Sequence, residues 1–500
     1  VNKLVSRHPN LRAAFVHNST GESLQIVQSS VTVPWSEVDL RGEVDVDAAL
    51  EEVLAADRGV RFEMDSAPLL RFTLITLADD HWRLLLTNHH ILLDGWSTPL
   101  VVKELITLYV TESDDSMLPR VPAYRDYLAW MRQRDVAIST AQWVSAMAGV
   151  EEPTLLVTGD RGRQLSTVSS ETERSLSIET TAALRDFAAR RGSTLNTLVQ
   201  TAWGIVLATL TGREDVVFGA TVSGRPPEVP GIEGMIGLFI NTLPVRVTLD
   251  RTETLGALVD RVQAEQAALL DHHYLGLTDI QRAAGAGVAF DTLTVFESYP
   301  VDRAGASAAT DFAGMQVTDI LGTDAAHYPL TLVSSVDERL NLKAKYLPEL
   351  FELEDVHAIV DRVERVLDAV LTDEQQPLAR LSLLADAEFG SLAPVFGLEG
   401  RSTRLLPEIF SDAAAVDPDA IAVRSVDGEL TYRELDRQSN RLARILLGHG
   451  VRTETFVALG IARSIESVLT VWAVAKSGAA FVPVDPNYPA DRIEHMLADS

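Results

Sequence analysis

The 500-residue chain contains no cysteine. This absence excludes disulfide bonds, a thiolate nucleophile and any zinc site that uses cysteine ligands. No apolar run approaches the roughly 18 residues of a membrane-spanning helix. No basic-then-apolar signal is present at the N-terminus, so we expect a cytoplasmic protein without a membrane segment.

Basic residues are scarce relative to acidic ones. Lys and Arg number 43 against 71 Asp and Glu, which gives a net charge of -28. Nucleic-acid binding requires clustered Lys and Arg that neutralise phosphates, so this balance argues against a nucleic-acid partner. The negative charge is spread along the chain, as expected for a solvated surface that keeps a large protein in solution.

Length and patterning predict several domains, because a domain averages about 150 residues. Mixed strand and helix patterns predict two α/β lobes at residues 1–145 and 146–385. Residues 386–404 lose periodicity and collect Gly and Pro, which indicates a linker, and a further unit follows at 405–500. The chain starts at Val1 rather than Met, so we expect a piece of a longer polypeptide.

Hydrophobic periodicity predicts the main elements of these units. Strands are expected at 69–77, 82–87, 216–222, 242–247, 290–296 and 340–346, and helices at 97–110, 180–191, 193–210, 254–271 and 353–371. In the helix at 97–110 we expect Ser97 or Thr98 as the cap and Leu100, Val101, Leu105 and Tyr109 facing inward. Ser193 is expected to cap the helix at 193–210. A capping box at Thr431 and Glu434 opens a helix in the last unit.

The most informative stretch is Asn88-His89-His90-Ile91-Leu92-Leu93-Asp94-Gly95-Trp96-Ser97, a polar cluster between a predicted strand and a predicted helix. Neighbouring strand residues point to opposite faces, so we expect only one of the two histidines to face a shared cavity. A metal site would need a third and a fourth ligand, and the only other histidine pair, His272 and His273, resembles a helix end. The pattern therefore favours one catalytic base over a metal site.

Further motifs accompany this stretch, and together they resemble the condensation domain of non-ribosomal peptide synthetases. Residues 88–97 resemble the motif that carries the active-site histidines of that family. The others, in chain order, lie at 7–15, 124–130, 236–246 and, less strictly, 272–275 and 327–330. The resemblance covers about residues 1–385, and the family's first motif would precede Val1.

The third unit resembles the beginning of an adenylation domain. Residues 430–435 and 475–485 resemble its first two motifs, and its phosphate-binding loop would lie beyond Ser500. ATP and magnesium would belong only to a complete adenylation domain, so no cofactor is expected on the chain itself. The resemblance implies a mixed α/β fold of two lobes, similar to chloramphenicol acetyltransferase, in a V-shaped arrangement with an active-site tunnel between the lobes.

The resemblance also implies the reaction and its partners. The α-amine of an aminoacyl thioester on a downstream peptidyl carrier protein attacks the acyl or peptidyl thioester on an upstream carrier protein. Both substrates hang on phosphopantetheine arms that enter the tunnel from opposite ends, and the adjacent adenylation domain acts in cis. A free α-amine has a pKa near 8 and must lose its proton to attack, which a histidine of pKa about 6.5 can assist.

Family precedent assigns this catalytic role to the second histidine, His90, either as a base or as a group that steadies the charged intermediate. His89 is expected to face away and to pack or hydrogen-bond structurally. We expect Asp94, which precedes Gly95, to be a buried carboxylate paired with Arg225, although a general-base role for Asp94 is the alternative.

Other residues of the motifs also have expected places. Trp96 precedes Ser97 at the end of the stretch 88–97, which carries the pattern HHxxxDG (two histidines, three further residues, Asp and Gly). It is expected to pack under the turn. Asn241 either donates to the intermediate or caps a strand.

Within the family, three stretches resemble elongating domains that join a donor ending in a D-residue to an L-residue. They are the Asp-Gly-Trp-Ser tetrapeptide, residues 237–244 and residues 290–300, where Ser298 departs from the usual Asn. The alternatives are an epimerisation domain, a stand-alone CoA-dependent acyltransferase and a non-catalytic recruitment module. An epimerisation domain would more often carry Asp-Gly-Val-Ser. The acyltransferase has no reason to carry residues 404–500, and a recruitment module would be expected to have lost His90 or Asp94.

Overall fold

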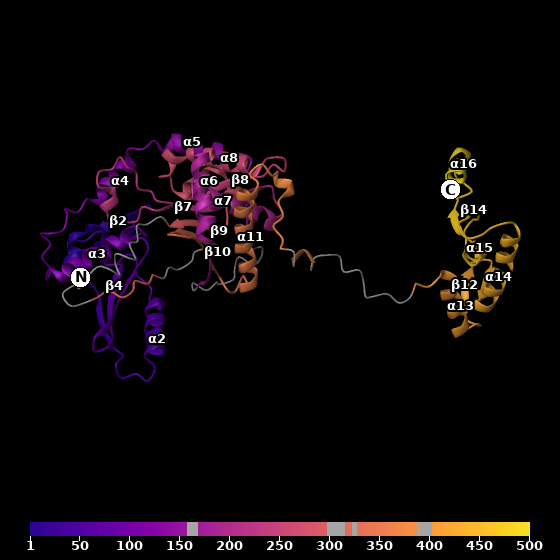
Figure 1. Ribbon diagram of the computed structural model, residues 1–500, viewed down its shortest axis with the longest axis horizontal. Helices are drawn as coiled ribbons and strands as arrows, with labels where there is room; N and C mark the ends of the chain where they lie inside the picture. Colours follow the sequence, from indigo (N-terminus) through magenta and orange to yellow (C-terminus); the bar gives the residue numbers. More distant parts are fainter. Residues whose placement is uncertain (158–168, 298–315, 323–327, 386–387, 391–402) are drawn as a thin grey trace. The chain divides into compact units, whose positions relative to one another are not determined.

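The computed structural model describes residues 1–500 except 158–168, 298–315, 323–327, 386–387 and 391–402. The chain divides into two compact units, Val1–Ala385 and Asp386–Ser500 (Figure 1). Most of the linker predicted at 386–404 lies outside the described residues. Within the described part of the chain, no helix combines the length and the apolar character that crossing a membrane requires.

The first unit begins with an N-terminal lobe built on a two-stranded sheet, β1-β2, and a three-stranded sheet, β3-β4-β5. Strands β4 and β5 form the predicted antiparallel hairpin, and β3 pairs parallel to β4. The elements of this lobe are α1 (Asn2–Arg7), β1 (Ala13–His17), β2 (Ser23–Val27), β3 (Trp35–Asp39), α2 (Val46–Gly59), β4 (Leu70–Ala78), β5 (His81–Asn88) and α3 (Ser97–Val110). Two helices follow along the chain, α4 (Tyr124–Arg132) and α5 (Val136–Ala146). Their buried side chains pack with later residues: Tyr127 of α4 with Phe239, and Trp143 of α5 with Leu243.

The C-terminal lobe of the same unit is built on a six-stranded sheet in the order β6-β11-β10-β9-β7-β8. Strand β9 pairs parallel to both β10 and β7, and the other pairs are antiparallel. Its strands are β6 (Ser170–Ser175), β7 (Asp215–Val222), β8 (Asn241–Thr248), β9 (Thr292–Glu297), β10 (Leu330–Val336) and β11 (Leu340–Tyr346). Its helices are α6 (Ile178–Arg191), α7 (Leu195–Thr211), α8 (Leu255–Ala267), α9 (Leu277–Ala284) and α11 (Leu353–Thr372).

Helices α6, α7, α8 and α11 gather beside this sheet and form the largest hydrophobic core with it (Figure 1). Helix α7 is buried along most of its length, because its apolar residues surround it on nearly every side. The mixed strand and helix content of both lobes agrees with the predicted α/β class.

Local capping explains where the helices of the C-terminal lobe begin and end. Helix α6 stops at Gly192, which adopts the left-handed conformation at φ 62°, and α7 stops at Gly212 in the same way. The prediction that Ser193 caps α7 is wrong. The cap is Thr194, whose side chain accepts a hydrogen bond from the backbone N–H of Thr197.

Helix α3 follows the turn at 88–96 and has the predicted bounds, Ser97–Val110, but its cap and the orientation of Tyr109 differ from the prediction. Neither Ser97 nor Thr98 is its cap, because the helix already begins at Ser97 and the carboxylate of Asp94 accepts the N–H of Ser97 instead. Tyr109, predicted to face inward, is 61% exposed, because the buried side of this helix turns through Val101 and Leu108 and leaves Tyr109 outside the core.

The second unit contains α13 (Leu406–Val416), β12 (Ile421–Ser425), β13 (Gly428–Thr431), α14 (Tyr432–Gly448), β14 (Phe456–Leu459), α15 (Ile465–Lys476), β15 (Ala480–Pro483) and α16 (Ala490–Asp499). The predicted capping box is confirmed. Thr431 accepts from the N–H of Glu434, and the Glu434 side chain accepts from the N–H of Thr431.

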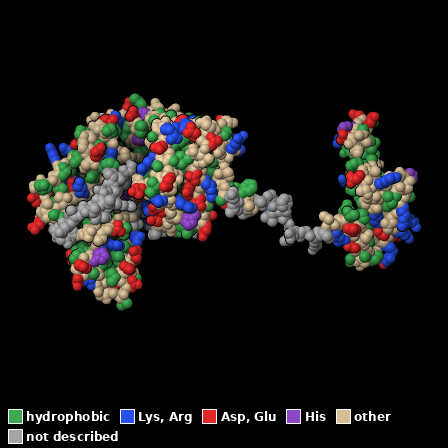
Figure 2. Space-filling model, in the orientation of Figure 1, with side chains coloured by type: hydrophobic (Ala, Val, Ile, Leu, Met, Phe, Trp, Pro, Cys, Tyr) green, Lys and Arg blue, Asp and Glu red, His purple; other side chains and the backbone are tan. Residues whose placement is uncertain are grey.

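Charged side chains are interspersed over the visible face of both units. Figure 2 shows Asp and Glu side chains mixed with Lys and Arg, without a continuous basic surface on that face. This distribution matches the expectation of a solvated acidic surface.

Candidate active site

The turn that carries the two histidines begins where β5 ends. Strand β5 stops at Asn88, and the N–H of His89 makes a last ladder-like hydrogen bond to the carbonyl of Leu69 at 2.9 Å. Strand alternation therefore does not extend to His90. The prediction that only one histidine borders the cavity is wrong, because both His89 and His90 border it.

His89 has a structural hydrogen bond. The backbone N–H of Ile91 donates to His89 Nδ1 at 3.1 Å, which requires that this nitrogen carry no proton. The ring also contacts Phe62 edge to face, with 6.5 Å between ring centroids. The prediction that His89 packs and hydrogen-bonds structurally therefore agrees with its contacts.

His90 is exposed and borders the cavity between the lobes. Its backbone carbonyl accepts the N–H of Leu93 at 3.3 Å, which closes the turn over the following residues. An exposed imidazole at the wall of a cavity is accessible to a substrate, as a general acid or base must be.

Asp94 is the buried centre of the turn. Arg225 Nη2 donates to both of its carboxylate oxygens, at 3.1 and 3.3 Å, and the side chains of Asp94 and Arg225 are 0% and 5% exposed. The N–H of Ser97 donates to Oδ1 at 2.8 Å and the N–H of Phe239 to Oδ2 at 3.0 Å. The ion pair predicted between Asp94 and Arg225 is thus present. Because four donor contacts occupy the carboxylate, the geometry favours a structural role for it.

Arg225 is fixed by further contacts in the C-terminal lobe. Its Nη1 donates to the carbonyls of Ile232 and Met235 at 2.6 and 3.1 Å, and its guanidinium lies 3.9 Å from the ring centre of Phe239. Burial lowers the pKa of Arg225, and the charge of Asp94 opposes that effect. The side chain therefore acts as a buried cation that holds several stretches of backbone together.

Ser97 and Trp96 attach the turn to the segment between β7 and β8. Ser97 Oγ accepts from Arg225 Nη2 at 2.9 Å and donates to the carbonyl of Gly237 at 2.8 Å. Trp96 Nε1 donates to the carbonyl of Glu233 at 2.9 Å. Trp96 also borders the cavity, so it does more than pack under the turn as predicted. Gly95 lies between these anchors and borders the cavity too.

Asn241, at the start of β8, holds a neighbouring loop. Its side-chain nitrogen donates to the carbonyls of His273 and Leu275 at 2.8 and 2.7 Å. Both donor hydrogens of this amide are therefore used. In this geometry Asn241 anchors the loop and has no hydrogen left to donate to an intermediate.

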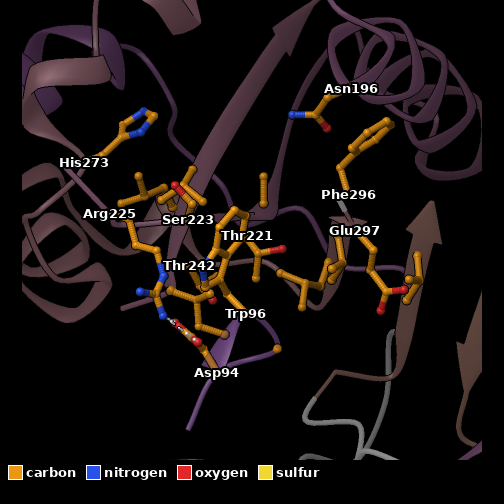
Figure 3. A pocket seen from close by; sticks show the side chains of 18 of the residues that line it. Asp94, Trp96, Asn196, Thr221, Ser223, Arg225, Thr242, His273, Phe296 and Glu297 are labelled. Atoms are coloured by element: carbon orange, nitrogen blue, oxygen red, sulfur yellow. Dashed lines mark hydrogen bonds and ion pairs between the residues drawn. The ribbon is translucent and has the colours of Figure 1, made fainter. Parts of the chain in front are cut away.

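The second histidine pair lies on that loop. His272 Nδ1 is 2.8 Å from Ser139 Oγ, which is in turn 2.6 Å from the hydroxyl of Tyr274. His273 borders the cavity, and burial lowers its pKa to about 4. Figure 3 shows its ring away from the Asp94–Arg225 pair. No cluster of metal-ligating side chains occurs among the described residues.

The cavity lies between the two lobes of the first unit and has a volume of about 2370 Å³. The N-terminal lobe contributes the turn at 88–96 and α3, and the C-terminal lobe contributes α7, β8, α8 and β9. In Figure 3 the Asp94–Arg225 pair lies on one side, and Asn196, Phe296 and Glu297 lie on the other. A large cavity with one reactive turn on its wall suits a long substrate that enters between the lobes.

Sequence reasoning missed several residues that support this turn. Phe239 donates through its backbone and contacts Arg225 through its ring, and Tyr124 donates to the carbonyl of Leu238 at 2.7 Å. Burial raises the pKa of Tyr124. Both residues lie in motifs noted above, at 124–130 and 236–246, which was the available signal. The motifs at 290–300 and 327–330 lie partly outside the described residues.

Fold and site together define a two-lobed domain with a histidine turn on the wall of an inter-lobe cavity. The description "Condensation domain" matches residues 1–393, and "AMP-binding enzyme" matches residues 410–500. The chain belongs to the condensation domain family of non-ribosomal peptide synthetases, and its C-terminal unit is part of an AMP-binding, or adenylation, domain. Domains of this family form amide bonds.

Two synthetases illustrate the similarity in sequence. Bacitracin synthase 3 of Bacillus licheniformis is 31% identical over 513 residues, which span 100% of this chain and 8% of the relative. Surfactin synthase subunit 3 of Bacillus subtilis (strain 168) is 30% identical over 508 residues, 100% of this chain and 40% of the relative. The chain thus spans less than half the length of either synthetase.

Solved structures share the fold. The four-domain non-ribosomal peptide synthetase AB3403, bound to AMP and glycine, aligns with a TM-score of 0.71 at 20% identity, over 99% of this chain and 39% of that one. The first condensation domain of the calcium-dependent antibiotic synthetase, in complex with a substrate analogue, aligns with a TM-score of 0.58 at 22% identity, over 76% of this chain and 88% of that one. The predicted condensation fold is therefore confirmed.

Proposed function

We propose that the first unit joins two carrier-bound substrates by an amide bond in the cavity that His90 borders. The α-amine of the aminoacyl acceptor attacks the thioester carbonyl of the donor. A C–N bond forms, the C–S bond breaks, and the departing thiolate takes a proton. The observation that carries this proposal is the exposed His90 on a turn that buried contacts hold rigid at the cavity wall.

In this proposal His90 takes the proton that the attacking amine must lose. A thioester is already activated, so no covalent enzyme nucleophile is needed, which suits a chain without cysteine. Asp94 holds the turn through Arg225 rather than moving protons, since both of its oxygens already accept hydrogen bonds from fixed donors. His89 fixes the turn from the other side through Ile91.

The proposed partners are an upstream donor and a downstream acceptor carrier protein with phosphopantetheine arms. The adjacent adenylation domain, of which the second unit is a part, would provide the acceptor. When complete, it would use ATP and magnesium to do so. The proposed place of action is the cytoplasm. The division into lobes at 1–145 and 146–385, with a linker at 386–404, also remains our proposal.

We further propose that the donor ends in a D-residue and the acceptor is an L-residue. The support is the sequence of the Asp-Gly-Trp-Ser turn and of residues 237–244. The test is peptide transfer between two loaded carrier proteins supplied to the 500-residue chain, with donors that differ only in the configuration of the last residue. Faster transfer from the D-terminated donor supports the subtype, and faster transfer from the L-terminated donor contradicts it.

A further inference from the structure

Two glutamines border the cavity with a buried side-chain atom that has no hydrogen-bonding partner. Gln200 on α7 is 3% exposed, and its Oε1 has no partner; Gln266 on α8 has a buried Nε2 that also has none, within the part of the chain that the structure describes. One is an unused acceptor and the other an unused donor. Buried polar atoms are nearly always satisfied in folded proteins, so each of these two calls for a partner.

One side-chain contact between α7 and α8 lies within a turn of both amides. Arg191, at the end of α6, contacts Asp260, and Thr197 Oγ1 donates to Gln263 Oε1 at 2.6 Å. Gln200 and Gln266 each lie one turn further on, three residues beyond Thr197 and Gln263. We call these two glutamines the amide recess.

The amide recess lies away from the reacting turn. Asn196, one turn before Gln200 on α7, lies across the cavity from the Asp94–Arg225 pair in Figure 3. A group bound at the recess therefore belongs to a part of the substrate distant from the bond that forms. Only an extended substrate can occupy both places.

We propose that the amide recess binds a secondary amide, namely a peptide bond of the tethered donor chain. Such a bond offers an N–H to Gln200 Oε1 and a carbonyl to Gln266 Nε2, which matches the two unused groups. This inference rests on the proposed function for its substrate and specifies a peptidyl donor rather than a single aminoacyl or fatty acyl group. A site that is built to hydrogen-bond its ligand binds more weakly any ligand that leaves the two glutamine groups unpaired.

The test measures binding to the 500-residue chain by calorimetry. The probe is a hydrolysis-stable pantetheine thioether that carries a dipeptide, compared with the same probe methylated at the peptide nitrogen and with pantetheine alone. We expect the dipeptide probe to bind about 3- to 10-fold more tightly than its methylated form. Gln200→Leu and Gln266→Leu should each remove this difference and leave pantetheine binding unchanged.

Gln142→Leu is the matched control, because Gln142 also borders the cavity but is exposed; it should preserve the difference. The Leu variants should keep the wild-type melting temperature, since the substituted atoms have no partners to lose. If one variant does not fold, the other carries the test.

Equal binding of the two dipeptide probes to the wild type overturns the proposal. The proposal is also overturned if the Leu variants lose affinity for pantetheine alone as much as for the dipeptide probe, because the recess would then bind the pantetheine arm. The measurement does not depend on condensation, so His90→Ala should retain the difference. Loss of activity in that variant would therefore bear on the proposed function and not on the recess.

Discussion

Arg225 Nη2 lies 3.1 Å from Asp94 Oδ1, and this buried ion pair joins the turn after β5 in one lobe to the segment after β7 in the other. Neither side chain is more than 5% exposed to solvent. A charge removed from such a pair leaves its partner buried and uncompensated, which costs far more than the pair contributes in net stability. Stability and the position of His90 therefore depend on the same contact.

Asp94→Asn should destabilise the first unit by about 3–5 kcal/mol, because it leaves Arg225 buried without a counter-charge. Denaturant unfolding measures this change. Asp279→Asn is the control, since its pair with Arg282 is exposed and should contribute at most about 1 kcal/mol. A stable, well-folded Asp94→Asn variant without activity would instead indicate direct chemistry at the carboxylate.

His90→Ala should reduce peptide transfer between loaded carriers by about 10²–10⁴-fold if the imidazole is a general base. His81→Ala, an exposed histidine at the start of β5, should leave the rate unchanged. A loss below tenfold would contradict the base assignment and favour a positioning role for His90. Single-turnover kinetics separate the chemical step from substrate binding.

Gly224→Ala should prevent stable folding of the segment that presents Arg225. Gly224 has φ +56°, and an added Cβ would lie 1.8 Å from the carbonyl oxygen of Phe239. We expect a loss above about 3 kcal/mol, from backbone strain and a clash that cannot relax. Gly212→Ala is the matched control: it has φ +67° but open space around the Cβ, so about 1 kcal/mol is expected. Equal melting temperatures for the two variants would rule out the clash.

His273 should make the first unit less stable in acid. Its pKa is about 4 in the folded state and 6.5 in the reference state, so the unfolded chain binds more protons between these values. The contribution of His273 to the free energy of unfolding is complete above pH 6.5 and falls as the pH drops towards 4. The total loss is at most about 3 kcal/mol, and the contribution changes no further below pH 4. His273→Gln should flatten unfolding free energy against pH in this window. An unchanged slope in the variant would show that other groups cause any acid loss.

Asn241→Leu should cost about 1–3 kcal/mol, because the carbonyls of His273 and Leu275 lose their donor. Thermal unfolding measures the loss, and peptide transfer by the folded fraction should keep a near-normal rate. A variant with wild-type stability and a large loss of kcat would indicate that Asn241 donates to the intermediate instead.

Much of the fold could be predicted from local patterns. The hairpin at 69–87, the strand Leu340–Tyr346 and the glycine ends of α6 and α7 follow from periodicity and from glycine conformation, which are properties of a few neighbouring residues. The errors were also local. Ser193 and Thr194 have similar capping ability, and only the direction of the backbone selects Thr194.

The site was less accessible from sequence, because it depends on contacts between distant segments. Arg225 follows as the partner of Asp94 from the resemblance to the family, whereas periodicity gives no reason to place the two side chains together. Strand alternation predicts one histidine at the cavity, but β5 ends at Asn88, so alternation does not apply to His89 and His90. Gln200 and Gln266 gave a faint signal, a polar residue within an apolar helix face, which does not show that the residue borders a cavity.

The contacts around Ser97 and Trp96 have a consequence for engineering by recombination. The backbone at Glu233 and Gly237 accepts hydrogen bonds from these two side chains, so the turn of one lobe is shaped to a loop of the other. A chimera that takes its lobes from different synthetases would cut through this match. Crossovers that transfer residues 88–97 together with 223–239 preserve it and should give the more soluble hybrids.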